Sequence, residues 1–419
     1  MQDDVARRAE EARSRAYAVP LAAYHVGDPQ LFRSDMLWPW FERLRLEDPV
    51  HYCAASEFGP YWSVTKQRDI IAVDSNHRVF SSDAELGGFT IYGSGSPRGQ
   101  ASFVELDPPL HEQQRNVIAP MFSSQNLAAL EPQLRAHTAN VLAALPVGAP
   151  FDFVDRVAVE LTSHMMALLF DFPFEQRRLL PRCSELMVAQ PGPGSIVASE
   201  KERVAELFKI LGLFIQLWDE RKALPPANNL ISLLALGEAT RRDAPEDYLG
   251  NIMLLIAAGS DTARHAIAGG MLALDQNRKE YERLKSDPAL IDSMVPEIIR
   301  WQSPIAHMRR TAREDCKLGG KTIRKGDKVV MWYVSGNRDE EVFSQADKFI
   351  IDRENARRHV SFGFGVHRCI GNRLAELQLK IVWEEILKRK LDIAVVGEPT
   401  RVLSSFVRGY ETLPVRMNA

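Results

Sequence analysis

The run of residues with the most chemical content is a single cysteine among glycines. The sequence SFGFGVHRCIGNR, residues 361–373, surrounds Cys369 with Gly363, Gly365 and Gly371. Glycine lets the backbone turn sharply and approach a flat ligand closely. A helix predicted from about Asn372 to Lys388 would place its N–H groups beside the sulfur, where they stabilise a thiolate. The pattern therefore predicts a loop that presents a thiolate, and a buried structural cysteine is the alternative.

Five positions of this loop also match a known pattern. Phe362, Gly365, His367, Cys369 and Gly371 fit F-x-x-G-x-[HR]-x-C-x-G, which resembles the haem-binding signature of the cytochrome P-450 superfamily. The resemblance implies haem b as the cofactor, with Cys369 as the axial ligand of its iron. A thiolate ligand pushes electron density towards the iron and favours O–O cleavage. Phe362, Gly363 and Gly371 would belong to the haem-binding loop.

A second motif places an acid and an alcohol inside an apolar helix. Ala258-Gly259-Ser260-Asp261-Thr262 lies in a helix predicted from near Pro245, capped by Asp243 or Ala244, to about Asp275. Asp and Thr are poor residues for a helix interior. The segment resembles the family's [AG]-G-x-[DE]-T, which implies oxygen activation by Thr262, proton relay by Asp261 and room for O₂ at Ala258 and Gly259. Ala263 stands where the family usually has Thr or Ser. A polar kink in a buried helix is the alternative.

Charged residues elsewhere match two further family features. Glu297 and Arg300 form E-x-x-R on one helix face, and the resemblance implies that Arg353 joins them in a structural lock. Haem propionates are carboxylates that need cationic or donor partners when buried. The resemblance assigns them to His111, Arg115, Arg310 and His367, with Arg309 as a rival for Arg310.

Composition excludes several classes of function. The chain has 419 residues, 45% hydrophobic and 26% charged, with a formal net charge of −3, which is ordinary for a globular protein and unsuited to general nucleic-acid binding. The four cysteines include no C-x-x-C pair. The first twenty residues lack the apolar stretch of a signal peptide, and the uncharged stretch 248–260 is too short to span a bilayer. We expect a cytoplasmic location.

The pattern of elements predicts a mainly α fold with a smaller β part, in one domain over residues 1–419. The β-rich parts are predicted at about 45–66, 305–335 and 391–416, and the helical core at about 108–302 and 372–389. Val50–Cys53 and Tyr61–Lys66 favour a hairpin, and 82–105 a long surface loop. A helix over Glu200–Leu224, capped by Ser199, carries one apolar stripe: Val204, Leu207, Phe208, Leu211, Phe214 and Trp218. The resemblance implies the P-450 fold, a triangular prism with a long central helix over the haem.

Strings along nearly the whole chain, such as FSSDAELGG, HMRRTA and SSFVRGYETLPVR, resemble the soluble bacterial hydroxylases of alkane and fatty-acid termini. This branch implies a monooxygenase that inserts one oxygen atom of O₂ at the end of an alkyl chain. Plain core packing is the alternative for each residue that family position assigns to the substrate pocket: Leu86, Phe89, Ile91, Leu255, Ile305, Met308 and Phe406.

Electrons must come from a partner, because the chain has neither a flavin-type glycine fingerprint nor a cysteine set for an iron–sulfur cluster. The resemblance implies a [2Fe–2S] ferredoxin with a flavin reductase, and a monomeric enzyme. Arg115, Arg368 and Arg373 could form a basic patch that steers this partner. The rival functions are a terpene monooxygenase, an H₂O₂-driven peroxygenase, a non-catalytic haem-thiolate sensor and a haem-free helical scaffold.

Overall fold

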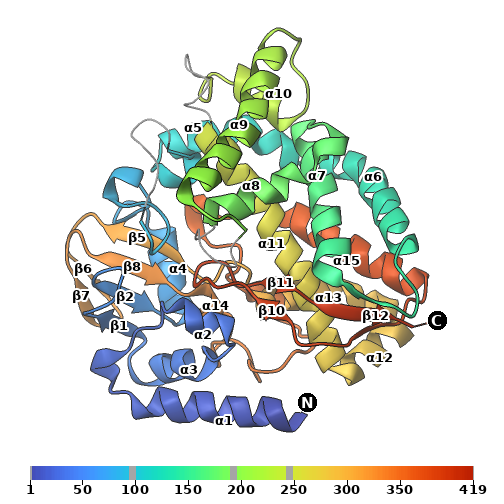
Figure 1. Ribbon diagram of the computed structural model, residues 1–419. Coiled ribbons are helices and arrows are strands. Elements are labelled where there is room, and N and C mark those ends of the chain that lie inside the picture. Colours follow the sequence, from blue (N-terminus) through green and yellow to red (C-terminus); the bar gives the residue numbers. More distant parts are fainter. Residues whose placement is uncertain (1, 94–100, 189–195, 242–248, 419) are drawn as a thin grey trace. The chain divides into compact units, whose positions relative to one another are not determined.

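The computed structural model describes residues 2–93, 101–188, 196–241 and 249–418 (Figure 1). The chain divides into two compact units, each assembled from segments that are distant in the sequence. Unit 1 takes its residues from Met1–Ser94, Ala268–Cys369 and Ala394–Val415, and unit 2 from Gly95–Ile267, Ile370–Ile393 and Arg416–Ala419. The assignment of residues 1–419 to one domain stays a prediction.

Unit 1 contains a five-stranded sheet with the order β1-β2-β8-β5-β3 (Figure 1). Its strands are β1 (Val50–Cys53), β2 (Tyr61–Val64), β3 (Phe80–Ser81), β5 (Met308–Ala312) and β8 (Lys328–Met331). The predicted hairpin is confirmed, since β1 and β2 pair antiparallel with Val50 opposite Val64. β2 runs parallel to β8, whereas β5 is antiparallel to both β8 and β3. The sheet therefore joins the N-terminal hairpin to strands from the last third of the chain.

The remaining elements of unit 1 include seven α-helices and two small hairpins within the described residues. Its helices are α1 (Gln2–Ala18), α2 (Pro29–Arg33), α3 (Trp38–Glu47), α4 (Gln67–Ser75), α12 (Arg278–Ser286), α13 (Ile291–Gln302) and α14 (Tyr333–Gly336). Two small hairpins are formed by β6 (Cys316–Leu318) with β7 (Lys321–Ile323) and by β10 (Thr400–Arg401) with β11 (Tyr410–Thr412). Helix α13 is buried over almost its whole circumference. A helix of this kind belongs to the interior, and its polar residues need partners there.

Unit 2 consists mainly of helices. They are α5 (Leu110–Ile118), α6 (Ser124–Ala143), α7 (Glu160–Phe170), α8 (Leu179–Val188), α9 (Glu200–Lys222), α10 (Leu230–Leu236), α11 (Leu249–Gln276) up to Ile267, and α15 (Asn372–Lys388). The remaining strands of the chain are all short: β4 (Pro150–Asp152), β9 (Ile393–Val395) and β12 (Pro414–Met417). Helices therefore predominate among the described residues, as the sequence predicts.

The cap predicted for α9 is confirmed, but its apolar stripe is partly wrong. The hydroxyl of Ser199 accepts a hydrogen bond from the Glu202 N–H. Leu211, Phe214 and Trp218 are buried, whereas Phe208 is 68% exposed. Phe208 lies at the solvent edge of the stripe because each residue turns the helix by about 100° from its neighbour.

Helix α11 is the long apolar helix expected from the sequence, and it is described from Leu249 onwards. Its predicted start at Pro245, with a cap at Asp243 or Ala244, lies outside the described residues, as do residues 94–100 of the predicted long loop. Within the described part of that loop, residues 84–86 and 103–105 each form a 3-10 turn. Across the described ranges, no helix combines the length and apolar character that a membrane span requires.

Candidate haem-thiolate site

The cysteine loop has a backbone that favours glycine at two positions. Gly363 and Gly365 adopt φ angles of 66° and 64°, in the left-handed region that side chains disfavour. A Cβ at Gly365 would also lie 2.4 Å from the carbonyl oxygen of Asp74. The loop closes through a 2.8 Å hydrogen bond from the Cys369 N–H to the Phe362 carbonyl. Cys369 is exposed and precedes the start of α15 by three residues.

One buried carboxylate, at the end of α4, holds this loop in place. Asp74 accepts hydrogen bonds of 2.7 Å from the Phe364 N–H, the Tyr333 hydroxyl and Arg310 Nη2. Burial, reinforced by Asp74, raises the pKa of Tyr333 well above its usual value, so Tyr333 remains a donor. Arg310, assigned to a propionate by the resemblance, is therefore already held by an acid, and a propionate would share it with Asp74.

Arg309, the alternative to Arg310 as a propionate partner, forms hydrogen bonds to a different segment. Its Nη1 donates to the Gly87 carbonyl at 2.8 Å, and its Nη2 donates to the Leu86 carbonyl at 3.0 Å and to Thr311 Oγ1 at 3.1 Å. The Arg309 N–H also donates to the Phe89 carbonyl at 2.7 Å. Arg309 thus ties the segment 86–89 to β5.

The remaining propionate candidates lie in both units. In unit 1, His367 Nε2 lies 2.8 Å from Ser82 Oγ. In unit 2, His111 is buried and Arg115 half-buried, one turn apart on α5. Gly371 adopts a φ of −88°, and a Cβ there would meet only the Phe122 ring, at 3.7 Å. The roles of these residues stay predictions.

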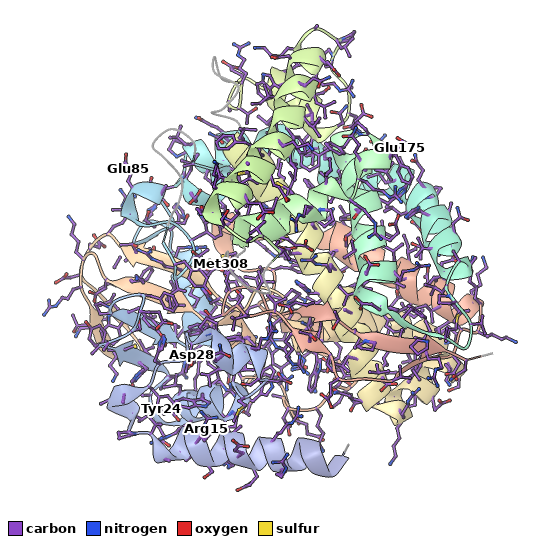
Figure 2. The ribbon with its side chains drawn as sticks, viewed as in Figure 1. Arg15, Tyr24, Asp28, Glu85, Glu175 and Met308 are labelled. Atoms are coloured by element: carbon purple, nitrogen blue, oxygen red, sulfur yellow. The ribbon has the colours of Figure 1, made fainter. Side chains whose placement is uncertain are left out.

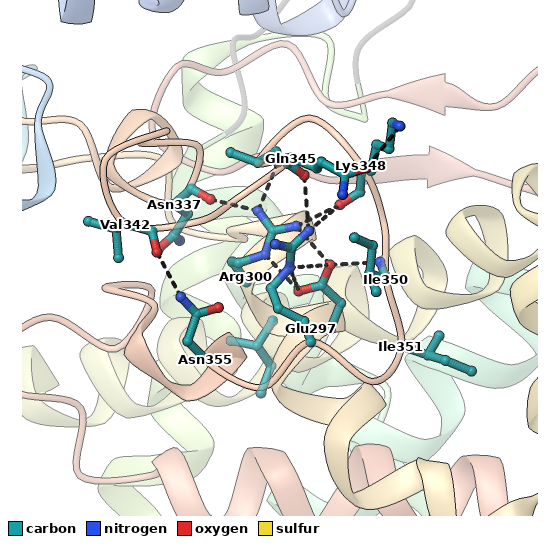
Figure 3. Close-up of polar contacts among 12 residues, drawn as sticks. Glu297, Arg300, Asn337, Val342, Gln345, Lys348, Ile350, Ile351 and Asn355 are labelled. Carbon is teal, nitrogen blue, oxygen red and sulfur yellow. Dashed lines mark hydrogen bonds and ion pairs between the residues drawn. The ribbon is translucent and has the colours of Figure 1, made fainter.

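Glu297, Arg300 and Arg353 come together in unit 1 as one buried cluster (Figure 3). Arg300 grips the Glu297 carboxylate through Nε and Nη2, both at 2.7 Å, and Arg353 Nε reaches it at 3.1 Å. Both arginines also donate to backbone carbonyls, which include those of Asn337, Gln345 and Lys348. The Ile350 N–H donates to Glu297 at 2.9 Å. The cluster therefore fixes the irregular segment between α14 and the cysteine loop.

In unit 2, the acid of the α11 motif belongs to a chain of polar contacts. Asp261 is buried; its Oδ2 accepts from Ser184 Oγ at 2.6 Å, and its Oδ1 pairs with Arg264 Nη2 at 2.7 Å. Arg264 Nη1 donates to Glu185 at 3.0 Å, and the Glu185 side chain is 39% exposed. The contacts thus run from a buried carboxylate to one at the surface.

The small residues of the same motif differ in their exposure to solvent. Ala258 is exposed and Thr262 is half-buried, although most of their neighbours on α11 are buried. Thr262 Oγ1 donates to the Ala258 carbonyl at 2.7 Å. At Gly259 a Cβ would lie 2.2 Å from Met166 Sδ, so Met166 packs directly against this glycine, while the room for O₂ at Ala258 and Gly259 stays a prediction. Ala258 and Thr262 therefore present the open strip of this helix, and Ala263 is buried.

Six of the predicted pocket residues lie in unit 1. There the His307 side chain forms hydrogen bonds to two of the segments that carry them, at Ile91 and at Ser405. His307 Nε2 accepts from the Ile91 N–H at 3.1 Å, so Nδ1 carries the proton and donates to the Ser405 carbonyl at 2.8 Å. Burial lowers the pKa of His307 to about 4 and keeps it neutral. The rings of Phe89 and Phe406 meet at 6.0 Å between centroids.

The other pocket candidates have varied surroundings. Met308 begins β5 and is labelled in Figure 2, and Ile305 forms an isolated bridge with Val407. Leu86 is 43% exposed, whereas Ile91 packs into a core with Tyr24 and Trp332. Leu255 packs into the core of unit 2. Their contact with a substrate stays a prediction.

Sequence reasoning missed Asp74, Ser184 and His307. Each is a single polar residue whose partners lie far away in the sequence, so no local spacing marks it. The only available signal was the position of a polar residue within an apolar run, which many solvent-facing residues share.

Comparisons with known proteins show the family to which this chain belongs. The model of the family described as Cytochrome P450 matches residues 80–389. Linalool 8-monooxygenase of Pseudomonas putida is 34% identical over 397 residues, which are 93% of this chain and 97% of that protein. A methyl-branched lipid omega-hydroxylase of Mycobacterium tuberculosis is 27% identical, with 95% of each chain covered.

A solved structure gives the same result for the fold. Cytochrome P450-153 from Novosphingobium aromaticivorans is 38% identical and superposes with a TM-score of 0.85, covering 94% of this chain and 99% of that one. P450 proteins bind haem b through a cysteine thiolate. The matched range contains Cys369, the Glu297 cluster and the Asp261–Thr262 pair. Both the sequence and the fold therefore make this chain a member of the cytochrome P450 family.

Proposed function

We propose that this P450 monooxygenase hydroxylates the terminal carbon of medium-chain alkanes or fatty acids, with haem b held by Cys369. The exposed thiol on its glycine-constrained loop fits this cofactor. The haem iron of P450 proteins takes one cysteine thiolate from the protein, and Cys369 is the proposed one. Phe362, Gly363, Gly371, His111, Arg115, Arg310, His367 and Ala258 are the proposed haem contacts. When bound, haem-thiolate supplies the activation of O₂.

The chain's own part in that chemistry is proton delivery. Asp261 is the proposed relay, because its carboxylate lies between the Ser184 hydroxyl and the Arg264–Glu185 pair, which reaches the surface. Arginine stays charged and does not itself pass a proton. Arg264 would therefore hold Asp261 in its resting position, from which rotation exposes the carboxylate to a proton donor. Thr262, one turn from Ala258, would hold the proton at the oxygen site.

A Thr262→Ala variant is expected to uncouple electron use from product formation by about two orders of magnitude, the lower end of the effect of a lost general-acid contact. Thr262→Ser keeps the hydroxyl and should retain most of the coupling. The measurement is the ratio of product to consumed electron donor, together with the H₂O₂ released, with a surrogate ferredoxin and reductase. Equal ratios for Thr262→Ala and the unchanged enzyme would exclude this role.

The observation that supports a linear substrate is the aromatic pair Phe89 and Phe406, on segments held by Arg309 and His307. A methyl C–H bond is stronger than its neighbours, so terminal attack depends on positioning. Two aromatic rings on fixed segments would narrow the proposed substrate pocket, so that the end of an alkyl chain would enter it first. The relative named for omega-hydroxylation supports the same regiochemistry.

Medium-chain alkanes or fatty acids are expected to shift the ferric haem from low to high spin, and Phe89→Ala should move hydroxylation from the terminal to inner carbons. Spectral titration over a compound panel and product analysis measure both. Tyr52→Ala, an exposed aromatic residue on β1, is the control and should change neither. A spin shift with linalool alone would favour the second candidate, a terpene monooxygenase, which the 34% identity to linalool 8-monooxygenase supports.

The proposed electron donor is a [2Fe–2S] ferredoxin with its flavin reductase, acting on a monomeric, cytoplasmic enzyme. Arg368 and Arg373 are exposed and Arg115 is half-buried, and cations of this kind steer an acidic partner. Turnover with H₂O₂ alone at the ferredoxin-driven rate would instead support the peroxygenase alternative.

A further inference from the structure

Unit 1 contains a cavity that the proposed function does not use. Its volume is about 260 Å³, and its walls come from the segment between α2 and α3, the C-terminal part of α11, the end of α13, Arg338 and the β10–β11 hairpin. None of its lining residues is among those proposed for haem, oxygen activation or substrate. The cavity is large enough for several water molecules or one small organic molecule.

The inner wall of the cavity is a buried guanidinium between two indoles. Arg338 Cζ lies 3.6 Å from the ring centroid of Trp301 and 4.2 Å from that of Trp38. Arg338 is only 8% exposed, and its Nε has no hydrogen-bond partner. In the part of the chain that the structure describes, its side chain forms no ion pair. Burial, with Arg300 and Arg408 nearby, lowers the pKa of Arg338 well below its usual value.

Two further arginines line the same cavity. Arg401 Nη2 donates to Asp35 at 2.8 Å, and Arg408 Nη2 lies 3.7 Å from the same carboxylate. Arg408 Nη1 also donates to the Trp301 carbonyl at 3.2 Å. The lining thus contains three guanidinium groups and only two carboxylates, those of Asp35 and Asp347. One positive charge of the lining is therefore not balanced by a negative one.

We propose that this cavity binds one small oxyanion, a carboxylate or a phosphate, with Arg338 as its principal donor. A buried cation without a partner is costly, and an anion removes that cost. Guanidinium presents paired N–H donors that match two oxygens of one such group. The indoles fix the guanidinium plane by cation–π contact and leave apolar walls, which favour a carboxylate with a small hydrophobic body. A single negative charge balances the lining.

The test uses the haem-loaded full chain with acetate, benzoate or inorganic phosphate at constant ionic strength, and chloride as the reference. Thermal unfolding and tryptophan fluorescence report binding, because a ligand that binds only the folded state raises its stability and Trp38 and Trp301 flank the site. Binding to the unchanged protein by either a carboxylate or phosphate supports the proposal and identifies the source. No response to any of them overturns it.

Variants make the assignment specific. Arg338→Gln should weaken binding by about tenfold or more, as expected for a lost charged hydrogen bond. Asp347→Asn removes an exposed carboxylate from the lining and should tighten binding several-fold without a loss of folding. Arg324→Gln, an exposed surface arginine paired with Asp315, should change nothing. Unaltered affinity in both cavity variants would overturn the proposal. If Arg338→Gln is too unstable to purify, unaltered affinity in Asp347→Asn alone overturns it.

Discussion

A Cys369→Ala variant is expected to lose completely the red-shifted Soret band that marks the reduced carbon monoxide complex of a haem-thiolate protein. The expectation follows from the loop geometry, in which a single exposed thiol lies on a backbone fixed by Gly363, Gly365 and Asp74. Oxygenation should be lost with the band, because only a thiolate supplies the electron density that favours O–O cleavage. Absorbance of the purified, reduced, CO-treated protein is the measurement.

Two further variants separate loss of the ligand from loss of the fold. Cys369→His should retain haem with a nitrogen ligand and an unshifted band. Cys316→Ala removes a half-buried thiol on β6 and should retain the red-shifted band unchanged. Persistence of that band in Cys369→Ala would mean that another side chain ligates the iron, and the oxygenase proposal would fail with it.

Glu297→Gln is expected to destabilise the fold by about 3–5 kcal/mol, the usual cost of removing one member of a buried ion pair. Glu297 and Arg300 are fully buried, and Arg353 is 7% exposed. Without the carboxylate, two guanidinium groups would remain buried with no counter-charge. The segment they fix leads to the cysteine loop, so the yield of haem-loaded protein should fall as well. Thermal unfolding and the haem content of the purified variant measure both effects.

Asp352→Asn is the matched control, because it removes a carboxylate from an exposed pair with Arg283 in the same unit. Exposed pairs contribute about 1 kcal/mol or less, so this variant should stay close to the unchanged protein. Arg353→Lys keeps the charge but loses the planar fork, and an intermediate effect is expected. Similar losses for Glu297→Gln and Asp352→Asn would show that the cluster does not stabilise the fold.

Features that depend on short-range spacing were predictable from the sequence. Three such features are the glycines around Cys369, the E-x-x-R pair and the hairpin at 50–64. Each is marked by a pattern only about a dozen residues long. The structure shows the expected loop, ion pair and strands. The cap of α9 belongs to the same class, since Ser199 and Glu202 are three residues apart.

Features that depend on packing between distant segments were not predictable. Met166 fills the space at Gly259 from another helix, 93 residues earlier (259 − 166). Arg310 and Asp74, which form a hydrogen bond, are 236 residues apart in the sequence. The residues next to Arg338 in the sequence do not indicate that two indole rings enclose it. A single sequence records that a residue is small or charged, but it does not record what faces that residue after folding.

The attachment of the segment 86–89 has a consequence for how this protein can diversify. Arg309 and its backbone bind main-chain carbonyls there, so the attachment does not depend on which side chains Leu86 and Phe89 carry. Gly87 is the exception, since its φ is 104° and a Cβ would collide with the Arg309 guanidinium at 2.3 Å. Substitutions at 86 and 89 therefore leave the anchorage in place. Under the proposed function, in which both side chains contact the substrate, this short stretch is a natural place for new specificities to evolve or to be engineered.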